Sequence, residues 1–415
     1  MRSRSRKGEP DYLQRLQRYV RKGPKLVVGV HSGTSADGPT VVIARISGFG
    51  DSARAAVLSH HTYEYPRRLR QLVLECTDRT TGTVERIVQA DMAVGEFIGD
   101  SVVAAVEAAA LSLADIELVG SSGQITYQVI PGERSEHLTC LGREYMGMLD
   151  LGEGSVIALK TGVVTVTTLR RKDNHVGGFG APMVPFGDWV NFRSDDEARV
   201  IWNIGGITNA TVLRAGAPFQ DVTAFDAGPG NMLIDQLVSR ASDGELTFDR
   251  DGELARSGRS HPGLVADHMG GRFIQQRPPK AAARQTFGVE AASRFWEAGI
   301  GLGLRPADIV ASATRLTVES LAFAQETFID PQVPNAELVF AGGGVFNLTL
   351  MEWLRERMPA RTLRTSDEFA VPVEAREALA MVLVANETVH GRPSNCVPAT
   401  GASRHVVQGK IDIPG

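Results

Sequence analysis

The segments KLVVGV (residues 25–30), HSGTSADG (31–38) and VVIARI (41–46) decide the fold at the start of the chain. Two apolar, β-branched runs flank a short polar turn, and this pattern predicts a β-hairpin. Glycines in the turn let other groups approach the backbone closely, and its N–H groups and hydroxyls can bind an anion. The turn is therefore a candidate phosphate loop, in which Asp37 is a candidate for holding a metal ion or its waters. A plain hairpin turn is the alternative interpretation.

Two later turns repeat this arrangement. Asn203-Ile204-Gly205-Gly206-Ile207-Thr208-Asn209 separates the predicted strands 200–202 and 210–213. Gly342-Gly343-Gly344 follows the predicted strand 337–340 and precedes a predicted helix, LTLMEWLRERM. Each turn alone is a weak signal, although backbone N–H groups at a helix N-terminus do complement negative charge. Three such turns in this order predict a nucleotide site.

Two further polar segments are candidates for the chemistry. Arg170-Arg171-Lys172-Asp173 follows an apolar run and leads into a glycine-rich turn. Neighbouring cations favour the ionised form of a carboxylate, so Asp173 is a candidate base near a phosphoryl-transfer site. A solvated loop is the alternative. The segment DAGPGNMLID (226–235) puts polar groups at a predicted helix start, where a simple N-terminus with Asn231 near the cap is the alternative.

The remaining pattern predicts an α/β chain in two parts. Helices are expected at 85–113, 231–240, 290–298, 308–328 and 374–390, and a loop or lid at 250–288, where RPPK breaks any helix. A division near residue 195 gives a basic extension (1–24) and domains at 25–195 and 196–415. In the extension, Leu13, Leu16 and Val20 have helical spacing, which predicts a short surface helix; a membrane-surface or targeting helix is the alternative.

The composition excludes several classes of protein. With 44 Lys+Arg against 48 Asp+Glu, the net charge of −4 argues against a nucleic-acid partner. The 3 cysteines (Cys76, Cys140 and Cys396) are too few and too scattered for a disulfide framework or a zinc site. No apolar run reaches the roughly 18 to 20 residues of a membrane helix, and there is no P-loop, HExxH or CxxC motif. We expect a cytoplasmic protein whose partners are small molecules, with no membrane contact.

The motifs VGVHSGTSADG, SGQITYQ, LRRKDNHVGGFGAPMVP, WNIGGITN, FDAGPGNMLID, PPK, VFAGGGVFN and EAREALA occur in this order. Together they resemble the anhydro-N-acetylmuramic acid kinases and the related levoglucosan kinases, from about Lys25 to near the end of the chain. The resemblance implies an α/β, two-domain actin/sugar-kinase/heat-shock ATPase-like fold with a nucleotide cleft between the domains. It also implies ATP and Mg²⁺ as cofactors, an anhydro sugar as substrate, and a homodimer.

The resemblance further implies roles for individual residues. Asp173 matches the catalytic aspartate, and Glu377 matches an acid that positions the metal or its waters. The implied substrate-side residues are Gln124, Arg170, Asp226, Gly228 and Asn231. The implied nucleotide-binding residues are Gly33, Thr34, Ser35, Ala36, Asp37, Gly38, Pro39, Thr40, Asn203, Gly205, Gly206, Gly342, Gly343, Gly344 and Asn347.

The implied reaction couples ring opening to phosphorylation. Asp173 deprotonates a water that attacks the anomeric carbon, and the released O6 takes the γ-phosphoryl group of ATP. The product is N-acetylmuramic acid 6-phosphate, an intermediate of peptidoglycan recycling.

Several positions depart from the family pattern, and most lie on the sugar side. Ser122 and Ile125 replace the His and Thr of His-Gly-Gln-Thr, Phe179 replaces a Gln, and Thr40 replaces an acid. Thr167-Thr168 stands in place of Gly-Asp, and the segment after Lys280 lacks Ser-Thr-Gly. Two alternatives therefore stay open: a kinase for levoglucosan or another anhydro sugar, and a nucleotide-binding regulatory protein without sugar turnover.

Overall fold

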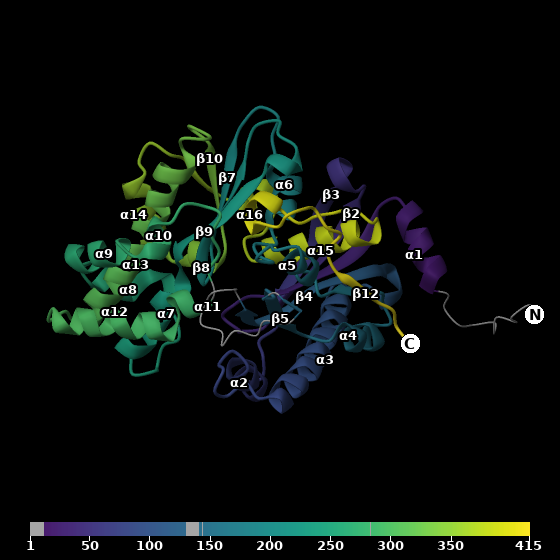
Figure 1. Ribbon diagram of the computed structural model, residues 1–415, viewed down its shortest axis with the longest axis horizontal. Helices are drawn as coiled ribbons and strands as arrows, with labels where there is room; N and C mark the ends of the chain where they lie inside the picture. Colours follow the sequence, from purple (N-terminus) through teal and green to yellow (C-terminus); the bar gives the residue numbers. More distant parts are fainter. Residues whose placement is uncertain (1–11, 130–140, 143, 283) are drawn as a thin grey trace, which may run out of the picture.

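The computed structural model describes residues 12–129, 141–142, 144–282 and 284–415, so Cys140 and residues 1–11 of the basic extension lie outside it. The strands form two sheets (Figure 1), with the orders β12-β6-β4-β1-β2-β3, to which β5 is added on β4, and β11-β10-β7-β8-β9. The strands are β1 (Lys25–Ser32), β2 (Pro39–Ser47), β3 (Arg54–Thr62), β4 (Ile116–Val129), β5 (Gly147–Leu151), β6 (Thr165–Thr167), β7 (Arg199–Ile204), β8 (Ile207–Leu213), β9 (Thr223–Pro229), β10 (Glu337–Ala341), β11 (Leu363–Thr365) and β12 (Lys410–Asp412).

The two sheets share one topology. In each, three successive strands pair antiparallel, β1-β2-β3 in one and β7-β8-β9 in the other. The first strand of each triplet then pairs parallel with β4 or β10, and β6 or β11 lies parallel beyond it. This repeated order confirms the predicted fold class, because the actin and sugar-kinase architecture was expected to contain two domains of related topology.

Both predicted hairpins are confirmed. β1 and β2 pair with Val28 opposite Ile43, and the glycine turn 33–38 joins them. β7 and β8 pair with Asn203 opposite Asn209 around Gly205 and Gly206. Each turn therefore lies at one end of its sheet, where the backbone is not committed to the strand ladder.

Helices cover the sheets. On α3, Ala90, Val94, Ile98 and Val102 recur at every fourth residue and are buried, because this spacing puts them on one helical face. α3 packs on β2, whereas α13 packs on β9 of the second sheet. The helices are α1 (Tyr12–Arg21), α2 (Arg67–Glu75), α3 (Val84–Ala108), α4 (Gly154–Thr161), α5 (Arg171–His175), α6 (Pro185–Phe192), α7 (Asn231–Ala241), α8 (Glu253–Ser257), α9 (Pro262–Met269), α10 (Arg272–Gln275), α11 (Arg284–Phe287), α12 (Val289–Gly301), α13 (Pro306–Ala324), α14 (Leu348–Arg357), α15 (Arg376–Val389) and α16 (Val397–Thr400).

The C-terminal part of the chain returns to the first sheet. α15 packs on β1 and β4, and β12 pairs antiparallel with β6. Met381 of α15 also shares a buried apolar cluster with Ile201 of β7 and Val339 of β10. One helix thus contacts the cores of both sheets, and Figure 1 shows it near the middle of the molecule. The division near residue 195 stays a prediction.

One expectation needs correction. Residues 250–288 are not a plain loop, because α8, α9, α10 and α11 form there, although no helix runs through the described part of 277–283. In the extension, the predicted surface helix forms as α1: Leu13 and Val20 are exposed, Leu16 packs partly against the core, and Tyr19 is buried. The Tyr19 hydroxyl donates to Oδ1 of Asn386 at 2.9 Å, which ties α1 to α15.

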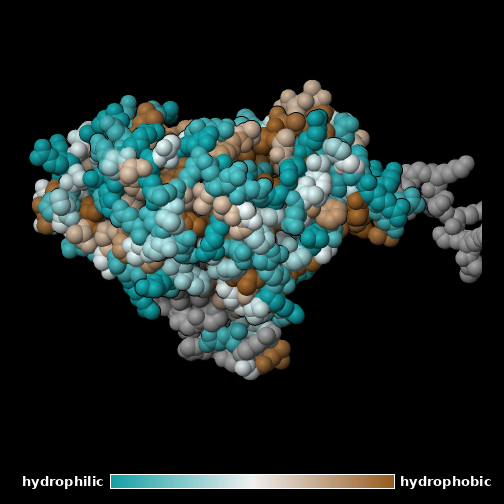
Figure 2. Space-filling view, turned by 90° about the horizontal axis from the view of Figure 1, so that it is seen from above, coloured by the Kyte–Doolittle hydropathy of each residue, from teal (hydrophilic) through white to brown (hydrophobic). Residues whose placement is uncertain are grey.

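On the face shown in Figure 2, hydrophobic residues are scattered among hydrophilic ones. Such scattered apolar side chains are normal on a folded protein. Among the described helices, none has both the length and the apolar character that crossing a membrane requires.

Candidate active site

The first two glycine turns, which come from different sheets, lie against each other. A Cβ atom added to Gly206 would lie 3.0 Å from Oγ1 of Thr34. The second turn also contacts the start of α7, because Gly230 N donates to Gly206 O at 3.1 Å and Asn231 N donates to Gly205 O at 2.8 Å. The predicted phosphate loops are therefore brought together by tertiary structure.

The third turn closes on the second. Gly342 has φ +84°, and a Cβ atom there would lie 2.8 Å from both Asn203 Oδ1 and Ile204 O. Asn203 is 3% exposed, and its Oδ1 atom has no hydrogen-bond partner among the described residues. A buried acceptor without a partner is costly unless a ligand or water satisfies it. This backbone cradle with one free acceptor fits a nucleotide.

Other predicted residues serve to build the cradle. Asn347 Oδ1 accepts from Leu350 N at 2.9 Å and so caps α14. Gly228 leaves room for Ser320, whose Oγ would lie 2.6 Å from an added Cβ. Gln124 Nε2 donates to Gly33 O at 3.0 Å, while its Oε1 accepts from Ser32 at 2.6 Å. Gln124 thus supports the first loop from β4.

Asp173 is fully buried on α5. Its Oδ2 atom accepts from Gly180 N at 2.9 Å, and Oδ1 accepts from Asn395 Nδ2 at 2.8 Å and from Thr400 Oγ1 at 2.9 Å. A Cβ atom on Gly178 would lie 2.1 Å from Oδ2, so only glycine leaves space above this carboxylate. The sequence argument relied on neighbouring cations, but the structure places three hydrogen-bond donors on the carboxylate instead.

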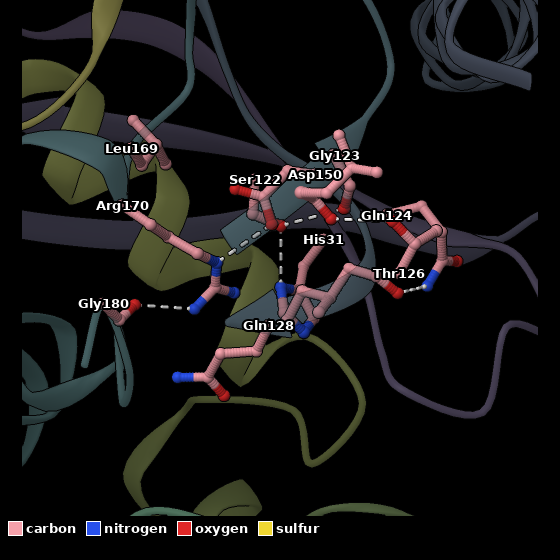
Figure 3. A network of polar contacts seen from close by, with 12 residues as sticks. His31, Ser122, Gly123, Gln124, Thr126, Gln128, Asp150, Leu169, Arg170 and Gly180 are labelled. Carbon is pink, nitrogen blue, oxygen red and sulfur yellow. Dashed lines mark hydrogen bonds and ion pairs between the residues drawn. The ribbon is translucent and has the colours of Figure 1, made fainter. Parts of the chain in front are cut away.

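Arg170 belongs to a buried polar network on the first sheet (Figure 3). Its Nη1 donates to Gly180 O at 2.9 Å, and its Nε lies 3.3 Å from Oδ1 of Asp150. Burial raises the pKa of Asp150, and the charges of Arg170 and Arg171 oppose that rise. In the same network, Nδ1 of His31 lies 2.9 Å from Ser122 Oγ.

Two aspartates of the DAGPGNMLID segment have strongly shifted pKa values. Burial raises the pKa of Asp226 to about 7, although Ala282 N donates to its Oδ2 at 2.7 Å and Lys280 is close. Burial also raises the pKa of Asp235 to about 7, and the negative charges of Asp37 and Asp249 add to that rise. The first loop and α7 lie close to each other, because a Cβ atom on Gly206 would lie 3.0 Å from Thr34 Oγ1 and 3.1 Å from Met232 Cε.

Carboxylates for a metal ion are present but dispersed. Among the described residues, no group of three or more His, Cys, Asp or Glu side chains could hold a metal by itself. Asp37 pairs with Arg70 at 2.8 Å, and the Glu377 side chain is 37% exposed. Mg²⁺ usually binds one or two carboxylates together with substrate phosphates and waters, and these residues fit that mode.

A large cavity lies beside α5. A cavity of about 1110 Å³ is bordered by Arg171, Asn174 and His175 of this helix, and by Tyr127 and Met148 of the first sheet. The buried Oδ1 atom of Asn174 has no hydrogen-bond partner in the described structure.

Sequence analysis missed several residues of this region. His31 lies within HSGTSADG itself but was not singled out, and its position directly before the loop was the available signal. Asp150 and Asn395 carry no local motif, and they enter the site only because distant segments pack together. Arg376 lies in the motif EAREALA beside Glu377, and that position was the available signal.

We expect Gly342→Ala to weaken ATP binding by roughly tenfold or more, equivalent to about 1.4 kcal/mol. The added methyl group meets a backbone oxygen at 2.8 Å and requires a positive φ that alanine rarely adopts. Calorimetric titration with ATP measures the effect. Gly301→Ala is the matched control, because no atom lies within 4 Å of its added Cβ. Unchanged affinity in a folded Gly342→Ala protein would remove the third turn from the nucleotide site.

Comparison with known proteins identifies relatives along nearly the whole chain. The family model for anhydro-N-acetylmuramic acid kinase matches residues 25–414. The protein of that name from Caldanaerobacter subterraneus subsp. tengcongensis is 36% identical over 97% of this chain and 100% of its own length. The one from Salinibacter ruber is 35% identical over 95% of this chain and 98% of its own length. The chain therefore belongs to the anhydro-N-acetylmuramic acid kinase family.

Proposed function

We propose that this protein uses ATP to open the 1,6-anhydro ring of anhydro-N-acetylmuramic acid and to phosphorylate O6, giving N-acetylmuramic acid 6-phosphate. The observation that carries the proposal is the meeting of three glycine turns around the unpartnered Oδ1 of Asn203. Family membership over residues 25–414 supports it, and so does the segment LRRKDNHVGGFGAPMVP, whose Asp173 resembles the family's catalytic aspartate.

The nucleotide lies along the glycine turns in this proposal. The loops at 33–40 and 203–206 hold its phosphates through backbone N–H groups, and the turn at 342–344 lies on the adenosine side. Glu377 and Asp37 are the carboxylates that would hold Mg²⁺, which neutralises phosphate charge when it is bound. Gly230 and Gly342 support this placement, because an added Cβ atom would lie 2.3 Å from Gly205 O and 2.8 Å from Ile204 O, respectively.

Asp173 acts as the base toward water. Its Oδ2 atom accepts one hydrogen bond in the structure, which leaves a lone pair for the proton of the attacking water. The water oxygen bonds to the anomeric carbon, the bond from that carbon to O6 breaks, and O6 takes the γ-phosphoryl group while ADP leaves. The water's second hydrogen stays on the new anomeric hydroxyl. The cavity beside α5 supports placing the sugar near this helix.

The substrate assignment is tested by incubating the protein with MgATP and either 1,6-anhydro-N-acetylmuramic acid or levoglucosan. We expect ADP release with the first sugar, together with one new reducing end for each ADP, because ring opening frees the anomeric carbon. A reaction without sugar is the control. Turnover of levoglucosan alone would support the alternative sugar, and ATP binding without turnover of either sugar would support a regulatory protein.

The proposal extends to assembly and location. The family resemblance supports a homodimer in the cytoplasm, with Mg²⁺ as the accompanying ion, and domains that divide near residue 195. The separate sheets, each with its own antiparallel triplet, support the domain division.

A further inference from the structure

The imidazole of His31 bridges two elements at the edge of the nucleotide loop. His31 lies at the end of β1, two residues before Gly33. Its Nδ1 atom lies 2.9 Å from Oγ of Ser122 on β4 (Figure 3), and its Nε2 atom lies 3.5 Å from Oε2 of Glu377 on α15. The His31 side chain is 12% exposed, whereas that of Glu377 is 37% exposed.

Close packing of α15 on the sheet fixes this arrangement. A Cβ atom on Gly29 of β1 would lie 2.0 Å from Ala378 O, and one on Gly120 of β4 would lie 2.6 Å from Met381 O. Larger residues at either position would push α15 away from the sheet. The two glycines therefore let α15 pack close to the sheet. This close packing brings Glu377, next to Ala378, within 3.5 Å of His31.

The contacts of His31 place one ring nitrogen on each of two neighbours. Nδ1 faces Oγ of Ser122, and Nε2 faces Oε2 of Glu377. The Ser122 hydroxyl also donates to Gly123 O at 3.3 Å, which ties this side chain to the backbone of β4. The imidazole thus spans the space between β4 and α15.

Glu377 depends on this contact for its orientation. In the described part of the chain, the polar partner of the Glu377 carboxylate is His31 Nε2, 3.5 Å from Oε2. A half-exposed glutamate without a fixed partner samples several rotamers, and fixing it costs side-chain entropy. Polar side chains that contact a metal-holding group orient that group.

We propose that His31 is a positioning residue that holds the Glu377 carboxylate toward the nucleotide loop through its Nε2 atom, 3.5 Å from Oε2, with Ser122 fixing the ring. The inference rests on the proposed function for the role of Glu377, although the contact itself does not. Ser122 stands where the resembled pattern has a histidine, and His31 supplies an imidazole from the neighbouring strand instead.

Three variants test the proposal. His31→Leu removes both ring nitrogens, Ser122→Ala frees the ring, and His31→Gln keeps an N–H donor at the end of a side chain of similar reach. His60→Leu is the matched control. His60 lies on β3, its Nε2 is 3.8 Å from Oε2 of Glu374, and neither residue belongs to the proposed site. For each variant, calorimetry gives the affinity for ATP with Mg²⁺ and with EDTA, and thermal unfolding reports the fold.

We expect His31→Leu to lose roughly 10- to 100-fold in Mg²⁺-dependent ATP affinity and in kcat, with little change in affinity in EDTA or in KM for the sugar. Ser122→Ala should show a smaller loss, and His31→Gln should recover most of it. Equal values for His31→Leu and His60→Leu, or equal losses for the Leu and Gln variants, would overturn the proposal. Because the affinity measurement needs no sugar, a failure of the proposed substrate is distinguishable from a failure of this inference.

Discussion

Replacing Asp173 with asparagine is expected to lower kcat by roughly 10²- to 10⁴-fold, the range that a positioned general base contributes. Asparagine has nearly the same shape but does not take the proton of the attacking water. ATP binding should persist, because the nucleotide turns lie on other segments of the chain. Steady-state kinetics with the anhydro sugar, and calorimetry with ATP, measure the two effects separately.

The surroundings of Asp173 require a control for folding. The new amide would point an N–H group toward the Gly180 N–H donor or toward Asn395 and Thr400, which costs about 1 to 3 kcal/mol of stability. Thermal unfolding therefore accompanies the kinetics. Lys172→Ala, which changes an exposed residue of the same helix, is the matched control. A folded Asp173→Asn protein with wild-type kcat would show that another group is the base.

The second large effect concerns the ion pair of Asp188 and Arg376. Asp188 on α6 accepts from Arg376 Nε at 2.7 Å and from Nη2 at 2.5 Å, and both side chains are at most 2% exposed. Thr211 of β8 adds a hydrogen bond to Asp188 at 2.6 Å. The pair thus joins α6, α15 and the second sheet, directly beside Glu377.

Asp188→Ala is expected to lower the free energy of unfolding by about 3 to 5 kcal/mol, because it leaves a buried guanidinium unpaired. Urea denaturation followed by circular dichroism measures the change. Replacing both partners, as Asp188→Leu with Arg376→Met, should recover much of the loss, since no buried charge remains. Glu352→Ala breaks the exposed pair with Arg256 and should cost less than about 1 kcal/mol. If Asp188→Ala costs no more than Glu352→Ala, the pair is not a stabilising link.

Local patterns predicted the elements that depend on nearby residues. The hairpins around 33–38 and 205–206 follow from apolar runs interrupted by glycine, and α3 and α15 follow from helical spacing and composition. The polar segment at 250–288 was read as a loop because its short helices lack a long apolar period. In α1, the burial of Tyr19 follows from the position of α15, which no local pattern indicates.

The sequence by itself determined the family, the two hairpins, the three glycine turns and Asp173 as the candidate base. These features are encoded in contiguous motifs, and glycine placement restricts the backbone locally. Tertiary structure alone decided that Asn395 and Thr400, 222 and 227 residues away from Asp173, hold its carboxylate, and that His31 faces Glu377. A side chain's hydrogen-bond partners are set by which segments share a buried space, and the close packing of α15 on β1 and β4 creates that space.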